Sequence, residues 1–316
     1  MQKELLVLCA LSLSLVGFSQ RMDNRLLLRE TGKNNQWKVH YDNDLFAGQD
    51  QNYSQGFRFD YSNVFFSKNP LNKFVIGKED ENTQYGMSVL HQVYTPEAIE
   101  EKAVQFGDRP YAAMLFLEMY KSTLIPTQKM KVSSGFSAGI IGQSAFGKAM
   151  QTTIHKASNG IKPEGWDNQM RNQPVFNYNA GIENEFFRYK NIFAAYTDIF
   201  GNIGNLTTNA IGGVTFVLGK TNSLFTESTS DFQIYLFSRP AAQFVLYDAS
   251  INGAWLNDEI YRIAFSNTNR FVSTHNFGLV IQSKKVFFEF SFTQISQEIK
   301  TAENAIWGGL KLGWVM

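Results

Sequence analysis

Cysteine, net charge and long apolar runs are all scarce in this chain of 316 residues. The single cysteine excludes a disulfide scaffold and any zinc site built on cysteine ligands. The 29 basic and 28 acidic residues nearly cancel, so the chain lacks the basic field that binds nucleic acid. Beyond the signal-like N-terminus no apolar run reaches the roughly 18 residues of a membrane helix, which excludes a helical membrane protein.

Aromatic residues, in contrast, are abundant. They make up 15% of the chain, which has 28 Phe and a net charge of only +1. A disordered chain is poor in aromatics and has a high net charge, so disorder is excluded. The length fits one large domain or two ordinary ones. Because no linker rich in proline or serine divides the chain, we expect one domain.

The N-terminal residues predict an export signal. A short apolar core over residues 5–16 follows Lys3, and the small residues Gly17 and Ser19 precede the expected cleavage site. Such a segment is removed on export, so we expect the protein to work in the cell envelope or beyond it. The expected organisation is a signal peptide, a polar lead segment and one β-barrel domain, over residues 1–19, 20–36 and 37–316.

After this segment, apolar and polar residues alternate with the period of β-strands. In one stretch Phe288, Phe290 and Phe292 share a face of the strand, and Glu289 and Ser291 share the other. Strands that cross a bilayer need about 9–11 residues, against about five or six in soluble sheets, and several strands in this chain have that length. Twelve strands are predicted, over residues 37–44, 54–63, 84–93, 110–120, 130–142, 176–188, 190–202, 208–220, 231–248, 269–283, 285–297 and 304–316.

The connections between these strands differ greatly in length. Those at 189–190 and 284–285 are tight, whereas those at 64–83 and 143–175 are long. Short periplasmic turns and long outer loops give transmembrane barrels this pattern. The predicted fold class is therefore all-β: a twelve-stranded antiparallel transmembrane β-barrel with a short helix in an outer loop. A soluble, secreted β-sandwich or a lipocalin-like barrel is the alternative.

Four polar motifs stand out in the first 175 residues. A barrel that only fills a membrane needs little unusual chemistry, so these motifs indicate a further function. The last motif includes residues 145–158, which have a helical pattern with Ser144 as the expected N-cap. Read in order, the motifs are NDxF with DxxYSxG, then YTP, then GDRPYA, and then GxxG…Q…H…GWDxQ. In this order and spacing they resemble the outer-membrane lipid A deacylase family of LpxR-like proteins.

The resemblance covers most of the chain after the signal peptide. It implies a twelve-stranded barrel that acts as a monomer in the outer membrane, with lipid A of lipopolysaccharide as its partner and substrate. It also implies that an ester of lipid A, the 3′-linked acyloxyacyl chain, is hydrolysed with the help of calcium. The residues themselves do not distinguish that ester from a phospholipid ester.

The resemblance also implies roles for individual residues. His155 matches the general base that activates water, a task that suits an imidazole at neutral pH. Asn43 and Asp44 match a pair in the family's site, where oxygen atoms suit calcium and an amide N–H can polarise the ester carbonyl. Ser54 matches a hydroxyl position, as a hydrogen-bonding group or as a nucleophile. The structural alternatives are a histidine in a loop helix, an Asx turn and an ordinary strand-start serine.

The chain departs from the family pattern at two positions. The calcium-ligating glutamate expected six residues after the general base is Ile161 in this chain, so Glu164 is the expected substitute ligand beside Asp44. The family's catalytic lysine falls at Glu101, so its neighbour Lys102 is the expected catalytic residue. Ile161 supports the alternative function, a non-catalytic or transport barrel that keeps the family fold.

Overall fold

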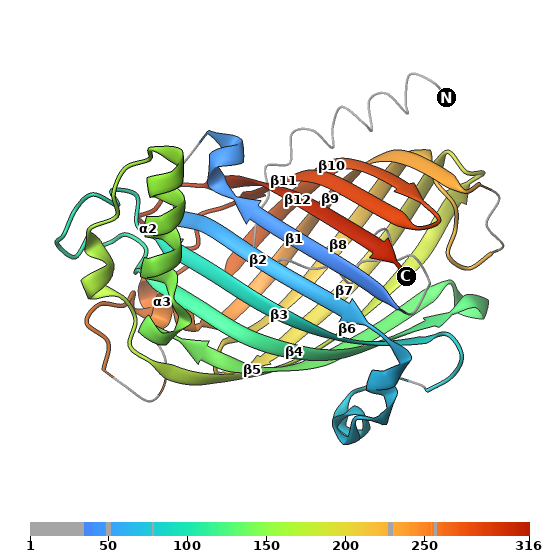
Figure 1. The fold of residues 1–316 in the computed structure, drawn as a ribbon, viewed down its shortest axis with the longest axis horizontal. Coiled ribbons are helices and arrows are strands. Elements are labelled where there is room, and N and C mark those ends of the chain that lie inside the picture. Colours follow the sequence, from blue (N-terminus) through green and yellow to red (C-terminus); the bar gives the residue numbers. More distant parts are fainter. Residues whose placement is uncertain (1–34, 49–51, 78, 227–229, 254, 256–257) are drawn as a thin grey trace.

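The computed structural model describes residues 35–48, 52–77, 79–226, 230–253, 255 and 258–316. The predicted signal peptide and most of the predicted lead segment lie outside the described residues. The described chain forms a closed barrel in which each strand is antiparallel to its neighbours and β1 closes the ring against β12 (Figure 1). The predicted twelve-stranded antiparallel barrel is confirmed. No described helix is long and apolar enough to cross a membrane.

The strands are β1 (Gln36–Asn43), β2 (Asn52–Ser62), β3 (Thr83–Thr95), β4 (Ala112–Ile125), β5 (Met130–Ile141), β6 (Gln173–Tyr189), β7 (Phe193–Gly204), β8 (Thr207–Lys220), β9 (Phe232–Asp248), β10 (Phe271–Ser283), β11 (Val286–Ile295) and β12 (Ala305–Val315). The helices are α2 (Gly147–Ser158), α3 (Ala249–Asn252) and the 3₁₀ turns η2 (Asp44–Ala47), η3 (Val64–Lys68), η4 (Pro70–Phe74), η5 (Pro126–Gln128), η6 (Gln143–Ala145), η7 (Gly165–Asn168) and η8 (Phe265–Asn267). Helix α2 is the predicted helix. The prediction that Ser144 caps it is wrong, because Ser144 lies in η6 and Phe146 precedes the helix, with φ at 62° and no side-chain cap.

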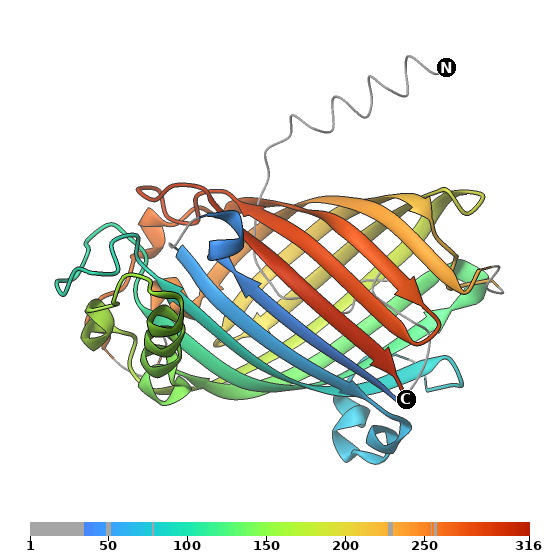
Figure 2. The ribbon, with the colours of Figure 1, turned by 45° about the horizontal axis from the view of Figure 1, so that its top comes forward.

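Long connections and tight turns give the barrel two different ends (Figures 1 and 2). One end, which we call the outer end, carries α2 and the connections 96–111, 142–172 and 249–270. The other, the inner end, carries the tight turns at 190–192 and 284–285 and the C-terminus. Outer-membrane barrels have short turns on the periplasmic side and longer loops outside. By this pattern, helix α2 belongs to the extracellular end of the barrel.

The long connection at 64–83, expected among the outer loops, lies at the inner end instead. Strand β2 runs from the outer end to the inner end, so the residues that follow it, including η3 and η4, lie on the periplasmic side. The prediction of an outer loop there is wrong, because loop length alone does not determine on which side of the membrane a loop lies. The direction of the strand decides the side.

The barrel wall is apolar outside and charged inside. Phe59 and Leu117 point outward and are exposed. Inside, Arg58 donates to Asp60 at 2.8 Å and pairs with Glu118 at 2.9 Å, and all three residues are at most 3% exposed. Buried charges require partners of this kind. Paired polar side chains therefore fill the lumen.

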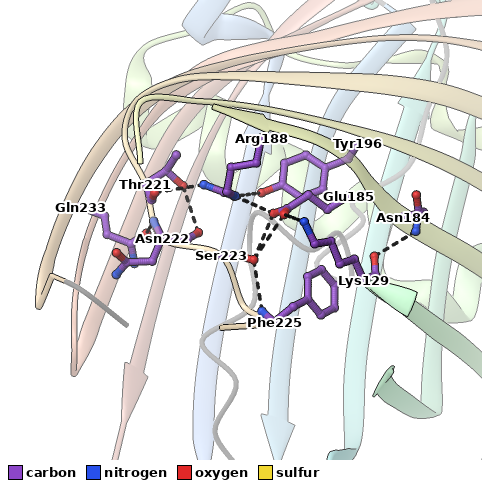
Figure 3. A network of polar contacts seen from close by, with 10 residues as sticks. All are labelled: Lys129, Asn184, Glu185, Arg188, Tyr196, Thr221, Asn222, Ser223, Phe225 and Gln233. Carbon is purple, nitrogen blue, oxygen red and sulfur yellow. Dashed lines mark hydrogen bonds and ion pairs between the residues drawn. The ribbon is translucent and has the colours of Figure 1, made fainter. Parts of the chain in front are cut away.

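Polar contacts also hold the connection between β8 and β9 across the inner end of the lumen (Figure 3). Glu185 of β6 accepts hydrogen bonds from Arg188 at 2.8 Å and from Ser223 at 3.2 Å. Arg188 also donates to the backbone carbonyl of Thr221 at 3.1 Å. Phe225, in the same connection, packs against an apolar cluster of the strands. Ser223 and Thr221 are buried, so the first residues after β8 are held against the inner side of the wall at this end.

Candidate active site on the outer face of the wall

Helix α2 packs on the outside of the barrel wall and not over the lumen. Val89 of β3 and Leu117 of β4 are paired and exposed, so both point outward. Side chains alternate along a strand, so every second residue from Val89 and from Leu117 also points outward. Val93 and Ala113 belong to this outward set, yet both are fully buried. Trp166, from the connection that carries α2, packs against them. The helix therefore stands at the outer end on the lipid-facing side of the wall (Figure 1).

One face of α2 is buried against this wall. Its buried residues are Gly147, Gln151 and His155, spaced four apart and therefore on one face of the helix. A Cβ atom at position 147 would lie 2.4 Å from the Cβ of Ala113 and 2.6 Å from the ring of Trp166. Glycine is therefore what lets the helix approach the wall closely enough to present Gln151 and His155 to it.

The hydroxyl of Ser54 meets α2 at a bulge in β2. The pairing of β2 with β3 shifts register at Ser54, and such bulges turn a side chain toward a new direction. The Oγ of Ser54 lies 2.7 Å from the Oγ1 of Thr95 and accepts a hydrogen bond from Nε2 of Gln151 at 3.4 Å. Oε1 of Gln151 accepts a hydrogen bond from Nε1 of Trp166 at 2.7 Å. These bonds fix the amide of Gln151 in one orientation.

Asn43, at the end of β1, contacts the same serine. Its Nδ2 donates to the backbone carbonyl of Ser54 at 2.8 Å, and its Oδ1 accepts from the N–H of Leu45 at 2.8 Å. The second bond caps η2, which is the Asx arrangement offered as the structural alternative. Asp44, the first residue of η2, is buried. Asn43 thus has a structural role and also lies beside Ser54.

His155 lies one helical turn after Gln151 and is also buried. Its Nδ1 lies 2.6 Å from the carbonyl oxygen of Ile161. A carbonyl only accepts hydrogen bonds, so Nδ1 carries the proton and Nε2 is the basic nitrogen of the neutral ring. The exposed side chain of Ile161 takes no part in this contact, and its backbone holds the ring. An imidazole fixed in this way is suited to act as a general base.

Among the described residues, Lys102 and Glu164 do not join this network. Lys102 is exposed, and its backbone carbonyl accepts a hydrogen bond from Nδ2 of Asn168 at 2.7 Å. The carboxylate of Glu164 pairs with Lys162 at 2.5 Å. The hydrogen bond from Lys162 holds the pKa of Glu164 below its usual value. Both residues lie in the loop surface around the site.

Comparison with known proteins identifies the family. A family model described as outer membrane protein LpxR matches residues 5–316. The chain belongs to the LpxR family. Among solved structures it is similar to LpxR from Salmonella typhimurium, with a TM-score of 0.72 and 16% identity over 89% of this chain and 100% of that one. The LpxR fold is therefore shared, and the protein is an outer-membrane barrel.

Other barrels are much less similar. The KdgM porin in complex with disordered oligogalacturonate has a TM-score of 0.42 and 8% identity, over 89% of this chain and 99% of that one. The beta domain of the Bordetella autotransporter Brka has a TM-score of 0.43 and 7% identity, over 90% of this chain and 99% of that one. A comparison with curated proteins gave no match.

One residue of this hydrogen-bond network was not among the predicted site residues. Gln151 lies four residues before His155 and connects Ser54 with Trp166. The sequence held a signal for it, since residues four apart in a helix lie on one face. Without the wall against which that face packs, the spacing alone did not show that Gln151 is buried.

The family resemblance implies calcium, with Asp44 and Glu164 as its expected ligands. Calcium takes about six to eight oxygen ligands, carboxylates prominent among them. Across the described part of the chain, no three His, Cys, Asp or Glu side chains gather to hold a metal ion. Glu164 is bound by Lys162, and the expected glutamate position holds the apolar Ile161. The acidic side chains alone therefore do not make up a calcium site, and we give calcium no step in the reaction.

The ester hydrolysis that the family resemblance implies is therefore expected to be insensitive to chelation. The rate of fatty-acid release by the folded protein in detergent micelles should be the same with excess EGTA and with added Ca²⁺. The physical reason is that the acidic side chains that would hold the ion are not assembled. A loss of activity in EGTA that Ca²⁺ alone restores would contradict this, and would point to a site made of Asp44 and backbone carbonyls.

The contact at Gly147 offers a test of how α2 positions the site. Gly147→Ala places a methyl group against Ala113 and Trp166, so α2 must move outward and carry Gln151 and His155 with it. A misplacement of about 1 Å costs on the order of a hundredfold in rate, and we expect a loss of that size. Gly201→Ala on β7 is the matched control, because its nearest neighbour atom would be 4.0 Å away. Equal rates for the two folded variants would show that α2 does not position the site.

Proposed function

We propose that this LpxR-family protein is a carboxylic ester hydrolase that removes a 3′-linked acyloxyacyl chain from lipid A. The observation that carries the proposal is the position of His155. It is a buried imidazole with a fixed tautomer, on a helix that covers the lipid-facing side of the wall at the outer end. An ester of a lipid in the outer leaflet reaches such a site directly from the membrane. The exposed apolar side chains of Leu45, Phe146 and Ile161, in the same segments, offer contacts for an acyl chain.

The proposed reaction follows from the tautomer of His155. Nε2 takes a proton from a water molecule while the water oxygen attacks the ester carbonyl carbon. The imidazolium that forms is stabilised through Nδ1–H by the carbonyl of Ile161. When the intermediate collapses, this proton passes to the departing lipid A oxygen, which becomes a hydroxyl, and the fatty acid leaves.

The negative charge on the attacked carbonyl oxygen needs an N–H donor. Nε2 of Gln151 is on the same face of α2 as His155, and its amide is fixed by Trp166. Nδ2 of Asn43 donates to the carbonyl of Ser54 and so holds the strand ends together. We therefore assign stabilisation of the oxyanion to Gln151 and a positioning role to Asn43. Removing one such donor costs about a hundredfold to a thousandfold in turnover.

Ser54 is proposed as a hydrogen-bonding residue and not as the nucleophile. Its Oγ is bonded to Thr95 and Gln151, whereas a nucleophilic serine is bonded to the base. Ser54→Ala removes two neutral hydrogen bonds, each worth about 0.5–1.5 kcal/mol, so we expect the rate to fall by about a hundredfold or less. Loss of about a millionfold, with an acyl group on the wild-type chain in intact-mass spectra, would instead establish Ser54 as the nucleophile.

The structure of the lumen argues against the alternative of a transport barrel. In a pore the inward side chains face water. Arg58, Asp60 and Glu118 are at most 3% exposed, and Thr221 and Ser223 at the inner end are also buried. Paired, buried groups inside the barrel favour a function on the wall over a function in the lumen.

The proposal is tested with purified, folded protein and two substrates. Release of fatty acid is measured from lipid A and from phosphatidylethanolamine in the same detergent. We expect release of one acyloxyacyl chain from lipid A and none from the phospholipid. Release from phosphatidylethanolamine alone would show that a phospholipid, and not lipid A, is the substrate. Release from neither lipid would favour a non-catalytic barrel, provided that the protein shows the heat-modifiable migration of a folded barrel.

A further inference from the structure

Residues 63–77, which we call the strap, lie on the outer face of the wall at the inner end. The backbone N–H of Ile76 donates to the phenol oxygen of Tyr178 at 3.1 Å, and the hydroxyl of Ser134 donates to the carbonyl of Ile76. Tyr178 and Ser134 both point away from the lumen. Tyr178 is paired with the exposed Phe136, and Ser134 lies two residues before Phe136 on the same face of β5. Figure 1 shows η3 and η4 outside the ring of strands, at the end opposite α2.

The strap covers polar residues of the wall that would otherwise face lipid. Lys121 and Thr123 of β4 point outward, in register with Tyr85 and Thr83, yet they are only 2% and 1% exposed. Both lie against Gly77, and Lys121 pairs with Glu79 at 3.4 Å. A lysine facing lipid on a barrel wall costs stability. With the strap in place, the lysine is paired and covered.

Most large apolar side chains of the strap are exposed, and its buried residues are Asn72 and Val75. Asn72 is buried, and its side chain donates to the carbonyls of Phe66 and Ser67 at 2.8 and 3.0 Å. The apolar side chains are turned outward: Val64, Phe65, Leu71, Phe74 and Ile76 are 62%, 69%, 46%, 76% and 58% exposed. A water-exposed loop has the opposite arrangement, because apolar surface is driven out of water. The strap is built for an apolar medium.

The position and charge of the strap define that medium. Tyr178, which holds Ile76, is in register with Phe136, an exposed residue of the lipid-facing wall. The apolar surface of the strap therefore continues that of the barrel. Lys68 and Lys73 are exposed among its aromatic side chains. Aromatic and lysine side chains together are typical of the zone where acyl chains meet headgroups.

We propose that the strap is an anchor inserted in the inner leaflet of the outer membrane, where Phe65, Leu71 and Phe74 contact phospholipid acyl chains and Lys68 and Lys73 bind headgroup phosphates. This anchor does not depend on the hydrolytic activity. It gives the barrel a second contact with the membrane, on the side opposite the active site. Its partner is an anionic phospholipid.

Spin labels in the full chain test the depth of the strap. The only cysteine, Cys9, is in the predicted signal peptide, so Phe65→Cys and Phe74→Cys each give a single labelling site in the mature protein. The barrel is folded in vesicles of phosphatidylethanolamine and phosphatidylglycerol, and collision with oxygen is compared with collision with a polar nickel chelate. Ile199→Cys, 70% exposed on the wall, is the lipid reference, and Asp167→Cys, with a side chain 85% exposed, is the aqueous reference.

We expect the oxygen-to-nickel ratio at both strap positions to match Ile199→Cys and to exceed Asp167→Cys by about tenfold, because hydrocarbon excludes the chelate. A ratio equal to that of Asp167→Cys would overturn the proposal. Dipolar broadening that disappears on dilution with unlabelled chain would also overturn it, because a second copy would then cover the strap. If one variant fails to show heat-modifiable migration, the other and Leu71→Cys give the same reading.

The headgroup contact is tested by removing the two charges. Lys68→Gln with Lys73→Gln, in the Phe74→Cys chain, should lower the ratio in phosphatidylglycerol vesicles to the value found without that lipid. Lys284→Gln with Lys285→Gln, at an inner-end turn away from the strap, is the matched control and should leave the ratio unchanged. An unchanged ratio for the strap variant would remove the phosphate contact from the proposal.

Discussion

Replacing His155 by alanine is expected to lower the rate of lipid A ester hydrolysis by about a hundredfold to ten thousandfold, the usual contribution of a general base. The variant loses the only imidazole on the buried face of α2, so no base remains there to take a proton from the attacking water. The barrel itself should be unaffected, because His155 lies outside the wall strands. Fatty-acid release by purified protein measures the rate, and heat-modifiable migration confirms the fold.

The matched control is a second histidine, which is partly buried. His275 of β10 is hydrogen-bonded to Ser238 at 2.8 Å and is far from α2 in the ring of strands. His275→Ala should leave the rate near that of the wild type. If both variants are equally active, His155 is a structural residue of a loop helix. If both lose activity, the loss reflects damage to the barrel and not to the base.

Replacing Arg58 by alanine is expected to have the largest effect on stability. Its guanidinium is bonded to Asp60, Ser88 and Glu118 inside the lumen, and all of these are buried. Removing one partner of a buried ion pair leaves charge without compensation and costs about 3–5 kcal/mol. Urea titration of the barrel in vesicles, followed by tryptophan fluorescence, measures this free energy of unfolding.

A surface ion pair provides the comparison. Lys148 and Asp167 lie 2.7 Å apart on the outer loops, and both side chains are largely exposed. Water screens such a pair, so Lys148→Ala should leave the urea midpoint unchanged. A small effect of Arg58→Ala, similar to that of Lys148→Ala, would mean that water enters the lumen, and would revive the transport alternative.

The fold was predictable from the sequence because the wall separates two media. Because one face of each strand meets lipid and the other meets paired charges, apolar and polar residues alternate with a period of two. Phe288, Phe290 and Phe292 display this alternation. Loop geometry has no such period. The sidedness of residues 64–83 was therefore wrongly predicted, and the false N-cap at Ser144 arose because Phe146 takes a left-handed conformation before the helix.

The site was only partly predictable for the same reason. His155, Asn43 and Ser54 were found by resemblance, and the structure connects the last two directly and places His155 on the helix that reaches them. That Ser54 turns toward α2 depends on a bulge, which no local pattern revealed. The predictions for Lys102 and Glu164 rest on their spacing from motifs, and spacing does not fix where a side chain points in a long loop.

The central claim is that His155, on the outer face of the wall, cleaves an ester of lipid A. The most direct test is the mass spectrum of lipid A extracted from cells that express either the wild type or His155→Ala, with equal amounts of folded protein in the outer membrane. We predict loss of one acyloxyacyl chain with the wild type and an unmodified lipid A with the variant. Loss of that chain with both, or with neither, would contradict the account.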